Sequence, residues 1–395
     1  MNTKDFFDAF KAQIELTANW QTMINTVENS PWHREANVAV HTNMTIEQYQ
    51  LQFYEQRTER QRIITLMALL FHDFGKPEAE ETLEKKDEPG VFYLRYAGHE
   101  PISGNVFLSF MIDHNELREM FFDQGFTWAD IRMIKVMIEH HLPYGFKNEQ
   151  KRQKLKQMID VTLGEDVVCF YDMLRSDCHG RISDDHETKK ANVEEWIAGF
   201  EVVEWHQRAI KNNAPELILL VGISGAGKTT YIKNLIGEHV VFAEDDLRLV
   251  YAREHMSDGQ YAAIADMSAA DHYQLCWNFC HLVKIETPDD GSPKRQSFDQ
   301  FSAAEFAKLL ATGKNIIIDR MNQNRKGRSK YIESAKAKGY KVSSVEFFIS
   351  ESKAKERQKT RGDKSLPDYR VHQISMQLET PWLGSEVDSM SIIIA

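Results

Sequence analysis

The stretch LLVGISGAGKTTYIKNL at 219–235 constrains the fold more than any other part of the sequence. Its apolar start reads as a buried strand, and the residues from Lys228 onward read as a helix. Between them, Gly222 to Thr229 fits G-x-x-x-x-G-K-[ST] at every fixed position. Glycines let such a loop turn tightly with its N–H groups around phosphate oxygens. The stretch therefore predicts an α/β domain that binds a nucleoside triphosphate.

Within this loop, Lys228 is expected to reach the β- and γ-phosphates, and the Thr229 hydroxyl to ligate Mg²⁺. The expected cofactors are therefore ATP, or another NTP, and Mg²⁺. The strand before the loop and the helix after it argue against a chance glycine-rich turn. The residues expected to contact the nucleotide are Gly222, Ser224, Gly225, Ala226, Gly227, Lys228, Thr229 and Thr230.

The apolar pattern divides the 395 residues into two regions. Residues 1–195 show helical spacing, apart from GVFYLRYAG at 90–98, which is read as a short hairpin or an extended loop. Residues 196–214 are expected to form a linker helix. From 215 to 395, β-branched runs alternate with helical patterns, which indicates a parallel sheet covered by helices. The expected fold is thus multidomain, all-α followed by α/β. The expected strands are ELILLVG, EHVVFAE, KNIIIDR, YKVSSVEFFIS and SIIIA.

Composition and net charge restrict the partners and the cellular compartment that we expect for this protein. The net charge of −11 argues against indiscriminate nucleic-acid binding, but 314–341 and 351–370 are basic, so a polyanion is expected to approach the C-terminal region. No apolar run is long enough to span a membrane, and the N-terminus lacks the features of a signal peptide. We therefore expect a cytoplasmic protein without a membrane partner. Four cysteines are too few and too scattered for a disulfide framework.

Charged residues follow the expected strands of the α/β region. Asp245 and Arg248 are three residues apart in FAEDDLRLVYA, so on a helix they share a face. Asp245 could accept the proton of an attacking hydroxyl while Arg248 holds a neighbouring phosphate. A capping acid with a surface arginine is the alternative. Asp319 ends the strand in KNIIIDR, where a carboxylate commonly serves Mg²⁺ or a bound water.

Two further features of this region each allow two interpretations. Arg357 and Arg361 are one helical turn apart before Gly362, which suits a lid near 351–366 that clamps phosphates; a solvated charged helix is the alternative. Cys276, Cys280 and His281 could suggest zinc, but no second ligand pair appears, so a packed helix is expected. These two cysteines lie in the long stretch 271–300.

The order of these motifs, from the P-loop through DDLR and DRMN to R-x-x-x-R-G before a proline, resembles the 5′-hydroxyl polynucleotide kinases of the phage type. The tail MQLETPWLGSEVDSMSIII is similar to that family's closing segment, and the resemblance covers about 215–395. It implies that Asp245 is the general base on the 5′-OH and that Arg248 holds the phosphate on the acceptor's 3′ side. It also implies that Asp319 supports the acceptor and that Arg357 and Arg361 form the lid.

A second group of motifs lies in the helical region. His72 and Asp73 are adjacent in LLFHDFGKP and offer a neutral and an anionic metal ligand. An aspartate can bridge two divalent ions, with histidines completing each shell. A single buried histidine is more simply a hydrogen-bonded core residue, so only the ordered set points to a metal site. The further candidate ligands are His41, His99, His140, His141 and Asp177.

The order H…HD…H…HH…D resembles the HD phosphohydrolase superfamily, and HDFGKP and GHEPISG look like the HD modules of some tRNA nucleotidyltransferases. The resemblance implies that Lys76 neutralises the phosphate or the leaving oxygen, and that Asp73 takes part in catalysis. It implies one or two ions of Mn²⁺, Ni²⁺, Co²⁺ or Zn²⁺. One implied shell is His41, His72, Asp73 and Asp177; the other is Asp73, His99, His140 and, further, His141. His33, His114, His179 and His186 are expected to be structural or on the surface.

The two regions together resemble the bacterial HD–polynucleotide kinase family of RNA end-healing enzymes. The resemblance implies NTP-dependent phosphorylation of 5′-OH ends and metal-dependent removal of 2′,3′-cyclic, 2′- or 3′-phosphates. The implied partners are RNA ends, tRNA among them, or DNA ends, with a separate ligase acting downstream. Two alternatives stay open: a nucleoside or small-molecule kinase fused to an HD nucleotidase, and a nucleotide-gated regulator whose HD pocket only binds.

Overall fold

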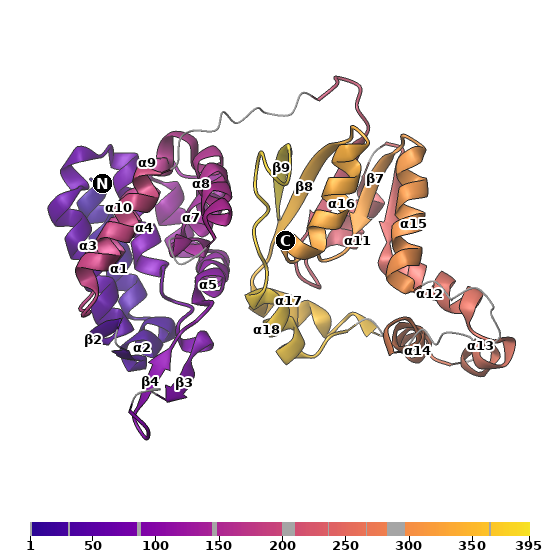
Figure 1. Cartoon of the computed structure of the whole chain (residues 1–395), viewed down its shortest axis with the longest axis horizontal. Coiled ribbons are helices and arrows are strands. Elements are labelled where there is room, and N and C mark those ends of the chain that lie inside the picture. The colour runs from indigo at the N-terminus through magenta and orange to yellow at the C-terminus, as the bar shows by residue number, and fades with distance from the viewer. Residues whose placement is uncertain are drawn as a thin grey trace. The chain divides into compact units, whose positions relative to one another are not determined.

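The computed structural model describes residues 2–30, 32–84, 88–143, 148–199, 210–235, 237–265, 267–282, 297–362 and 365–395 (Figure 1). The chain forms two compact units. One consists of Met1–Gln207 and His372–Ser385, and the other of Arg208–Val371 and Glu386–Ala395. The structure therefore adds 372–385 to the N-terminal unit, whereas the sequence placed them in the C-terminal domain. Of the expected linker helix at 196–214, residues 200–209 lie outside the described residues.

The N-terminal unit is helical and is built around α4 (Glu59–Phe71), which packs against α3, α7 and α9. Ile64 and the run from Leu66 to Phe71 are fully buried, as expected of a helix covered on every side. Thr58 starts α4 with a capping box to Gln61. The other helices are α1 (Thr3–Glu15), α2 (Ala18–Asn25), α3 (Val38–Gln52), α5 (His99–Asp113), α6 (Asn115–Phe122), α7 (Trp128–Glu139), α8 (Glu149–Leu163), α9 (Val167–His179) and α10 (His186–Ala198), with short 3₁₀ turns η1 (Tyr54–Gln56), η2 (Pro77–Ala79) and η4 (Gly164–Asp166).

Two antiparallel hairpins complete this unit. One pairs β1 (Val27–Ser30) with β2 (His33–Asn37), and the other pairs β3 (Glu81–Glu84) with β4 (Phe92–Arg95). The stretch 90–98, read as a short hairpin or an extended loop, thus contributes only the second strand of a hairpin whose first strand lies at 81–84. In the part of the chain that the structure describes, no helix is both long enough and apolar enough to cross a membrane.

The C-terminal unit holds a five-stranded parallel sheet in the order β6-β7-β5-β8-β9, which confirms the expected α/β fold and its five strands. Its central strand β5 is buried along almost its whole length, as expected of a strand covered on both faces. The strands are β5 (Glu216–Val221), β6 (His239–Ala243), β7 (Asn315–Asp319), β8 (Lys341–Phe348) and β9 (Ser389–Ile394). The helices are α11 (Lys228–Asn234), α12 (Glu244–His255), α13 (Asp258–Ala265), α14 (Ala269–Leu282), α15 (Phe298–Ala311), α16 (Arg325–Ala337), α17 (Glu351–Gln358) and α18 (Asp368–Met376).

This topology brings the expected nucleotide-site segments to one edge of the sheet. The P-loop follows β5, Asp319 ends β7, and α12 begins directly after β6, with Ala243 paired to Asp319. Helix α17, which carries part of the expected lid, follows β8, the second strand that pairs with β5. In parallel sheets the carboxyl ends of the strands form the ligand-binding crevice. The fold therefore places the expected phosphate-binding loop between the expected acceptor side and the expected lid.

The segment 372–385 supplies hydrogen-bond acceptors to two buried cationic side chains on α7. Arg132 and Lys135 are 3% and 1% exposed, which is costly for a charge without a partner. Arg132 Nη2 donates to the Pro381 carbonyl at 2.5 Å, and Lys135 Nζ donates to Thr380 Oγ1 at 2.8 Å. Lys135 Nζ also pairs with the buried Glu139 carboxylate on the same helix, so residues that follow the α/β region in sequence add to the partners of these cations.

Candidate nucleotide site and candidate metal centre

The P-loop carries its lysine across the phosphate cradle. Gly227 has φ +93°, a left-handed conformation that glycine adopts readily, and it starts α11 directly at Lys228. Lys228 Nζ donates to the carbonyls of Gly222 at 2.7 Å and Ile223 at 2.9 Å. Burial in the loop lowers the pKa of Lys228 to about 8, although the nearby charge of Asp319 opposes this shift. A bound triphosphate would offer Lys228 anionic phosphate oxygens in place of these two neutral carbonyl oxygens.

The two expected lid arginines both reach the P-loop. Arg357 Nη1 donates to the Gly225 carbonyl at 3.1 Å, and Arg361 Nη1 donates to Ser224 Oγ. The sequence expected one helix through both arginines, ended by Gly362. Instead, α17 ends at Gln358, four residues before that glycine. Arg361 therefore reaches the loop from the turn after the helix.

Asp245 and Arg248 lie together on the first turn of α12. Asp245 Oδ1 accepts from Arg248 Nη1 at 2.7 Å and from the Tyr273 hydroxyl at 2.8 Å. The Asp245 side chain is 60% exposed, so a substrate can reach it. Tyr273 comes from α14, the helix in which the sequence noted two cysteines. Both donors use Oδ1, which leaves Oδ2 as the oxygen available to a substrate proton.

Glu244 is a functional candidate that the sequence analysis missed. It is 4% exposed, and its Oε2 accepts from Arg248 Nη2 at 3.2 Å. Its Oε1 accepts from Arg320 Nη1 at 2.9 Å, from Lys330 Nζ at 3.0 Å and from the Tyr331 hydroxyl. Burial would raise the pKa of Glu244, but Arg320 and these other donors lower it. Glu244 therefore orients Arg248 and binds two more cationic side chains. In the sequence, only its position directly before DDLR could have drawn attention to it.

The zinc alternative at Cys276, Cys280 and His281 gains no support from the described residues. Cys276 is fully buried in an apolar cluster with Tyr251 and Phe298. Cys280 Sγ contacts the Arg248 carbonyl at 3.8 Å. Among the residues with described side chains, no metal-binding group includes either thiol. The helix α14 packs through these cysteines, as the sequence expected.

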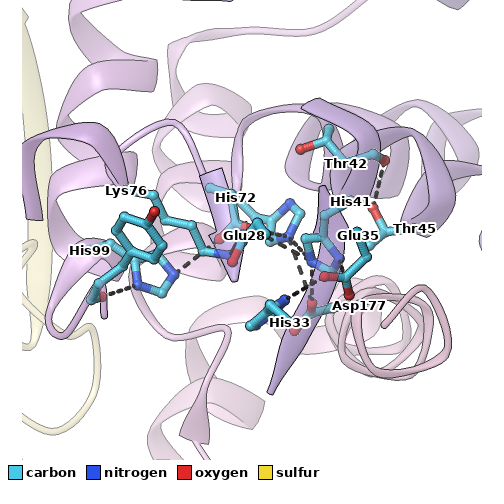
Figure 2. Close-up of polar contacts among 12 residues, drawn as sticks. Glu28, His33, Glu35, His41, Thr42, Thr45, His72, Lys76, His99 and Asp177 are labelled. Atoms are coloured by element: carbon cyan, nitrogen blue, oxygen red, sulfur yellow. Dashed lines mark hydrogen bonds and ion pairs between the residues drawn. The ribbon is translucent and has the colours of Figure 1, made fainter. Parts of the chain in front are cut away.

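In the helical unit, His41, His72 and Asp177 converge in the interior (Figure 2), and Asp73 joins His41 and His72 there. They come from α3, the end of α4 and α9. His41 Nε2 lies 3.0 Å from Asp177 Oδ1, 3.5 Å from Asp73 Oδ2 and 3.4 Å from His72 Nε2. His72 Nε2 lies 3.2 Å from the same Asp73 oxygen. The structure therefore assembles the first expected shell.

The other oxygen of Asp73 serves a second group. Asp73 Oδ1 lies 3.0 Å from His99 Nε2 and 3.7 Å from His141 Nε2, and these two nitrogens are 3.1 Å apart. The sequence analysis assigned His140 to this second shell ahead of His141, but His140 is not part of the group. Its Nε2 accepts from Trp382 Nε1 at 3.1 Å, because α7 ends at Glu139 and the two histidines then point apart. Asp73 thus bridges the two groups.

Three of the four imidazoles are fixed in the same way. Each ring places Nδ1 against the backbone carbonyl three residues earlier, so the Nδ1–H donates there and Nε2 faces the cluster. The pairs are His72 with Leu69 at 2.7 Å, His99 with Tyr96 at 2.6 Å, and His141 with Ile138 at 2.8 Å. Two neutral rings held this way would bring lone pairs together, so a cation belongs between them. Burial works against charge on His99, yet its hydrogen bond to Asp73 raises its pKa, whereas burial lowers the pKa of His141.

The spacing of these atoms fits divalent ions. Bonds of about 2.1 Å put neighbouring ligands about 3.0 Å apart in an octahedron and about 3.4 Å apart in a tetrahedron. The observed separations around Asp73 run from 3.0 to 3.7 Å. Imidazole and carboxylate ligands suit first-row transition metals such as Mn²⁺, Co²⁺, Ni²⁺ and Zn²⁺.

Lys76 and Arg181 supply positive charge beside the cluster. Lys76 is 3% exposed, and its Nζ lies 2.8 Å from Asp73 Oδ2 and 2.6 Å from Glu28 Oε1. These two contacts use two of the three N–H donors of the Lys76 ammonium group, which leaves one for a phosphate oxygen. Arg181 Nη2 donates to Asp177 Oδ2 at 2.6 Å. The sequence analysis missed Arg181, although its spacing of four residues from Asp177 on α9 could have drawn attention to it.

Gly75 allows the two groups to share Asp73. A Cβ atom at this position would lie 2.5 Å from both the His99 carbonyl oxygen and the Ser103 nitrogen. Gly75 N also donates to Ser103 Oγ at 2.8 Å. The glycine in HDFGKP therefore lets α5 approach the turn after α4, which brings His99 to Asp73.

The hairpin β1–β2 adds residues that the sequence analysis set aside. His33 was expected to be structural or on the surface, but its ring lies 4.9 Å from that of His41. Glu35 is buried between these two histidines, and Glu28 binds Lys76. A short polar strand gives no apolar pattern, so the sequence did not reveal that these three side chains face inward.

Comparisons with known proteins cover only part of the chain. Residues 217–381 match the family model AAA_33, described as an AAA domain, so the C-terminal region carries a P-loop kinase-like domain. No curated protein matches the chain.

Among the solved structures that resemble parts of the chain are the following two. A gluconokinase from Sinorhizobium meliloti 1021 is 19% identical over 46% of this chain and 83% of its own, with a TM-score of 0.27. A chain of the Pnkp1/Rnl/Hen1 complex is 18% identical over 40% of this chain and 43% of its own, with a TM-score of 0.25. At these scores neither similarity bears on function.

Proposed function

We propose that this chain is a bifunctional RNA end-healing enzyme. Its α/β unit phosphorylates 5′-OH polynucleotide ends with an NTP, and its helical unit is an HD-type hydrolase that removes 2′,3′-cyclic, 2′- or 3′-phosphates. Many ribonucleases leave these two kinds of end, and a ligase needs a 5′-phosphate and a 3′-OH. A separate ligase would then join the healed ends in the cytoplasm.

The kinase step uses groups at the carboxyl edge of the sheet. The 5′-hydroxyl oxygen attacks the γ-phosphorus, its proton passes to Asp245 Oδ2, and the nucleoside diphosphate leaves. Lys228 and the lid arginines neutralise the charge that builds up on the transferring phosphoryl group. Mg²⁺, held with the help of Thr229, would supply further charge neutralisation. Asp319 sits close enough to influence Lys228 electrostatically and is proposed to support this region.

One observation carries the kinase half of the proposal: the contact of 2.7 Å between Asp245 and Arg248. A carboxylate for a hydroxyl and a guanidinium for a phosphate stand side by side. An acceptor that uses both must carry its reactive hydroxyl close to a second, unreactive phosphate. A 5′-OH nucleotide with a 3′-phosphate has this arrangement, whereas a simple sugar or a nucleoside does not.

The hydrolase half depends on the Asp73 cluster. Divalent ions bound there would supply an activated water and bind phosphate oxygens. The chain's own residues orient the site: Asp73 links the two groups, and Lys76 and Arg181 offset the negative charge of the carboxylates. The buried setting strengthens these interactions, because water does not screen them.

A direct assay separates this proposal from its alternatives. A 5′-OH RNA ending in a 2′,3′-cyclic phosphate would be incubated with ATP, Mg²⁺ and Mn²⁺, and both ends read. We expect a 5′-phosphate and a 3′-OH on the product. Phosphate transfer to a free nucleoside or to gluconate, but not to RNA, would favour a small-molecule kinase. Binding of nucleotide with no change at either RNA end would favour a regulator.

A further inference from the structure

Glu35 occupies an unusual place beside the metal cluster. It lies on β2 with a side chain that is fully buried, and Ile182 N donates to its Oε1 at 2.8 Å. The next residue, Ala36, has φ +78°, a conformation uncommon for a residue other than glycine. A register shift in the facing strand β1 accompanies it. Such irregularities re-aim side chains, and here Glu35 is turned inward.

His41 differs from the other three imidazoles in what holds its second nitrogen. His72, His99 and His141 place Nδ1 against neutral carbonyls of their own segments. His41 Nδ1 instead faces a carboxylate, 3.5 Å from Glu35 Oε1 (Figure 2). The other oxygen, Oε2, lies 3.5 Å from His33 Nδ1. In the described part of the chain, His41 Nδ1, His33 Nδ1 and Glu35 Oε2 are buried and make no hydrogen bond.

We propose that Glu35 is a positioning residue that makes the two metal positions unequal. By accepting the Nδ1–H of His41, the carboxylate fixes Nε2 toward the cluster and increases its electron density. The position formed by His41, His72, Asp73 and Asp177 then holds its divalent transition-metal ion more tightly than the position formed by Asp73, His99 and His141. This inference rests on the metal centre in the proposed function.

His33 completes the arrangement by holding the far side of Glu35. Its ring stands nearly perpendicular to that of His41, at 86°. Its Nδ1 faces Glu35 Oε2, so the ring can give the carboxylate one N–H. With Ile182 N on the other oxygen, the carboxylate has a fixed orientation. Charge on a metal-bound His41 would draw the contact of 3.5 Å toward the roughly 2.8 Å of a charge-assisted hydrogen bond.

The test compares Glu35→Gln with the wild type by metal titration of the full chain. Calorimetry with Zn²⁺, and visible absorption with Co²⁺, would resolve the first and second ions. We expect Glu35→Gln to weaken the first ion about 10- to 100-fold while the second ion changes little. In the zinc-loaded wild type, the Nδ1–H of His41 should give a downfield, exchange-protected proton resonance that moves upfield in the variant.

Asp172→Asn is the matched control. Asp172 is another buried carboxylate of the same unit, but it binds Arg57 at 2.5 Å rather than a histidine of the cluster. It should lower stability without changing either metal affinity. Unchanged affinity of the first ion in Glu35→Gln, or an equal loss of both ions, would overturn the inference. If the wild type bound no metal, the hydrolase half of the proposed function would fail too. If the wild type binds two ions and hydrolyses cyclic phosphate, but Glu35→Gln leaves the first ion unchanged, only the role of Glu35 is wrong.

Discussion

His99 Nε2 lies 3.1 Å from His141 Nε2, and both nitrogens face Oδ1 of Asp73. Each ring donates from its Nδ1 to a backbone carbonyl, so neither can turn away easily. The two nitrogens are therefore placed to bind one cation together with Asp73 Oδ1. His140 is the adjacent residue, yet its Nε2 binds Trp382 instead.

The two neighbouring histidines give the first prediction. His141→Ala should abolish one of two bound transition-metal ions, because it removes a ligand that His140 cannot replace. His140→Ala should retain both ions and lose only stability. Metal content after dialysis against Mn²⁺ or Co²⁺, measured by elemental analysis, distinguishes them. Equal metal content in both variants would mean that the second ion position is not where we place it.

Gly75→Ala tests whether the approach of α5 assembles the bridged centre. The added Cβ would meet two backbone atoms at 2.5 Å, and such crowding costs about 1–3 kcal/mol or more. We expect a lower unfolding free energy and a weaker ion at His99 and His141. Gly259→Ala is the control, since a Cβ there meets nothing within 4 Å. A Gly75→Ala protein with wild-type stability and metal binding would contradict this account.

Lys228 predicts a pH dependence of stability for the nucleotide-free chain. Its pKa is about 8 in the folded chain and near 10.5 when unfolded, so the unfolded chain binds more protons between these values. The contribution of Lys228 to stability is therefore unfavourable below about pH 8 and is relieved as the pH rises toward 10.5. Lys228→Met should be more stable than the wild type at pH 7, with the difference shrinking by pH 10.

Denaturant unfolding at several pH values measures this difference. Lys233→Met serves as the control, because Lys233 is an exposed lysine on the same helix. Its stability difference from the wild type should not depend on pH. If the curves of Lys228→Met and wild type ran parallel from pH 7 to 10, the P-loop environment of Lys228 would have to differ from that described here.

Glu244→Gln should weaken acceptor binding in the kinase reaction. Its carboxylate aligns Arg248 and holds Arg320 and Lys330, and hydrogen bonds to charged groups are worth about 1.5–3 kcal/mol. We expect KM for a 5′-OH oligonucleotide to rise about 10- to 100-fold, while KM for ATP changes little. Glu254→Gln, on the exposed face of the same helix, should behave like wild type. A rise in KM for ATP alone would place Glu244 in the nucleotide site instead.

The sequence predicted well those features that depend on local patterns. The five parallel strands and the P-loop follow from such patterns. The grouping of His41, His72, Asp73, His99 and Asp177 came instead from the resemblance to the HD phosphohydrolase superfamily. Features that depend on long-range contacts escaped it. Nothing local distinguishes His140 from His141, because the end of α7 and the contact with Trp382 decide which ring turns inward.

The same limit explains Glu35 and the segment 372–385. Glu35 sits on a short polar strand, and only the backbone of Ala36 and the ring of His41 reveal its direction. The segment 372–385 belongs to the helical unit, where its oxygens accept hydrogen bonds from Arg132 and Lys135. Neither relationship has a signature within a window of the sequence.

The most direct test of the account follows both ends of one RNA with separate variants of each site. With a 5′-OH, 2′,3′-cyclic phosphate RNA, ATP and metals, Lys228→Ala and Asp245→Ala should abolish 5′ phosphorylation and leave 3′-end hydrolysis intact. His72→Ala and Asp73→Ala should abolish hydrolysis alone. Loss of both activities in either pair, in proteins with wild-type circular dichroism, would contradict the claim that one chain carries two independent sites.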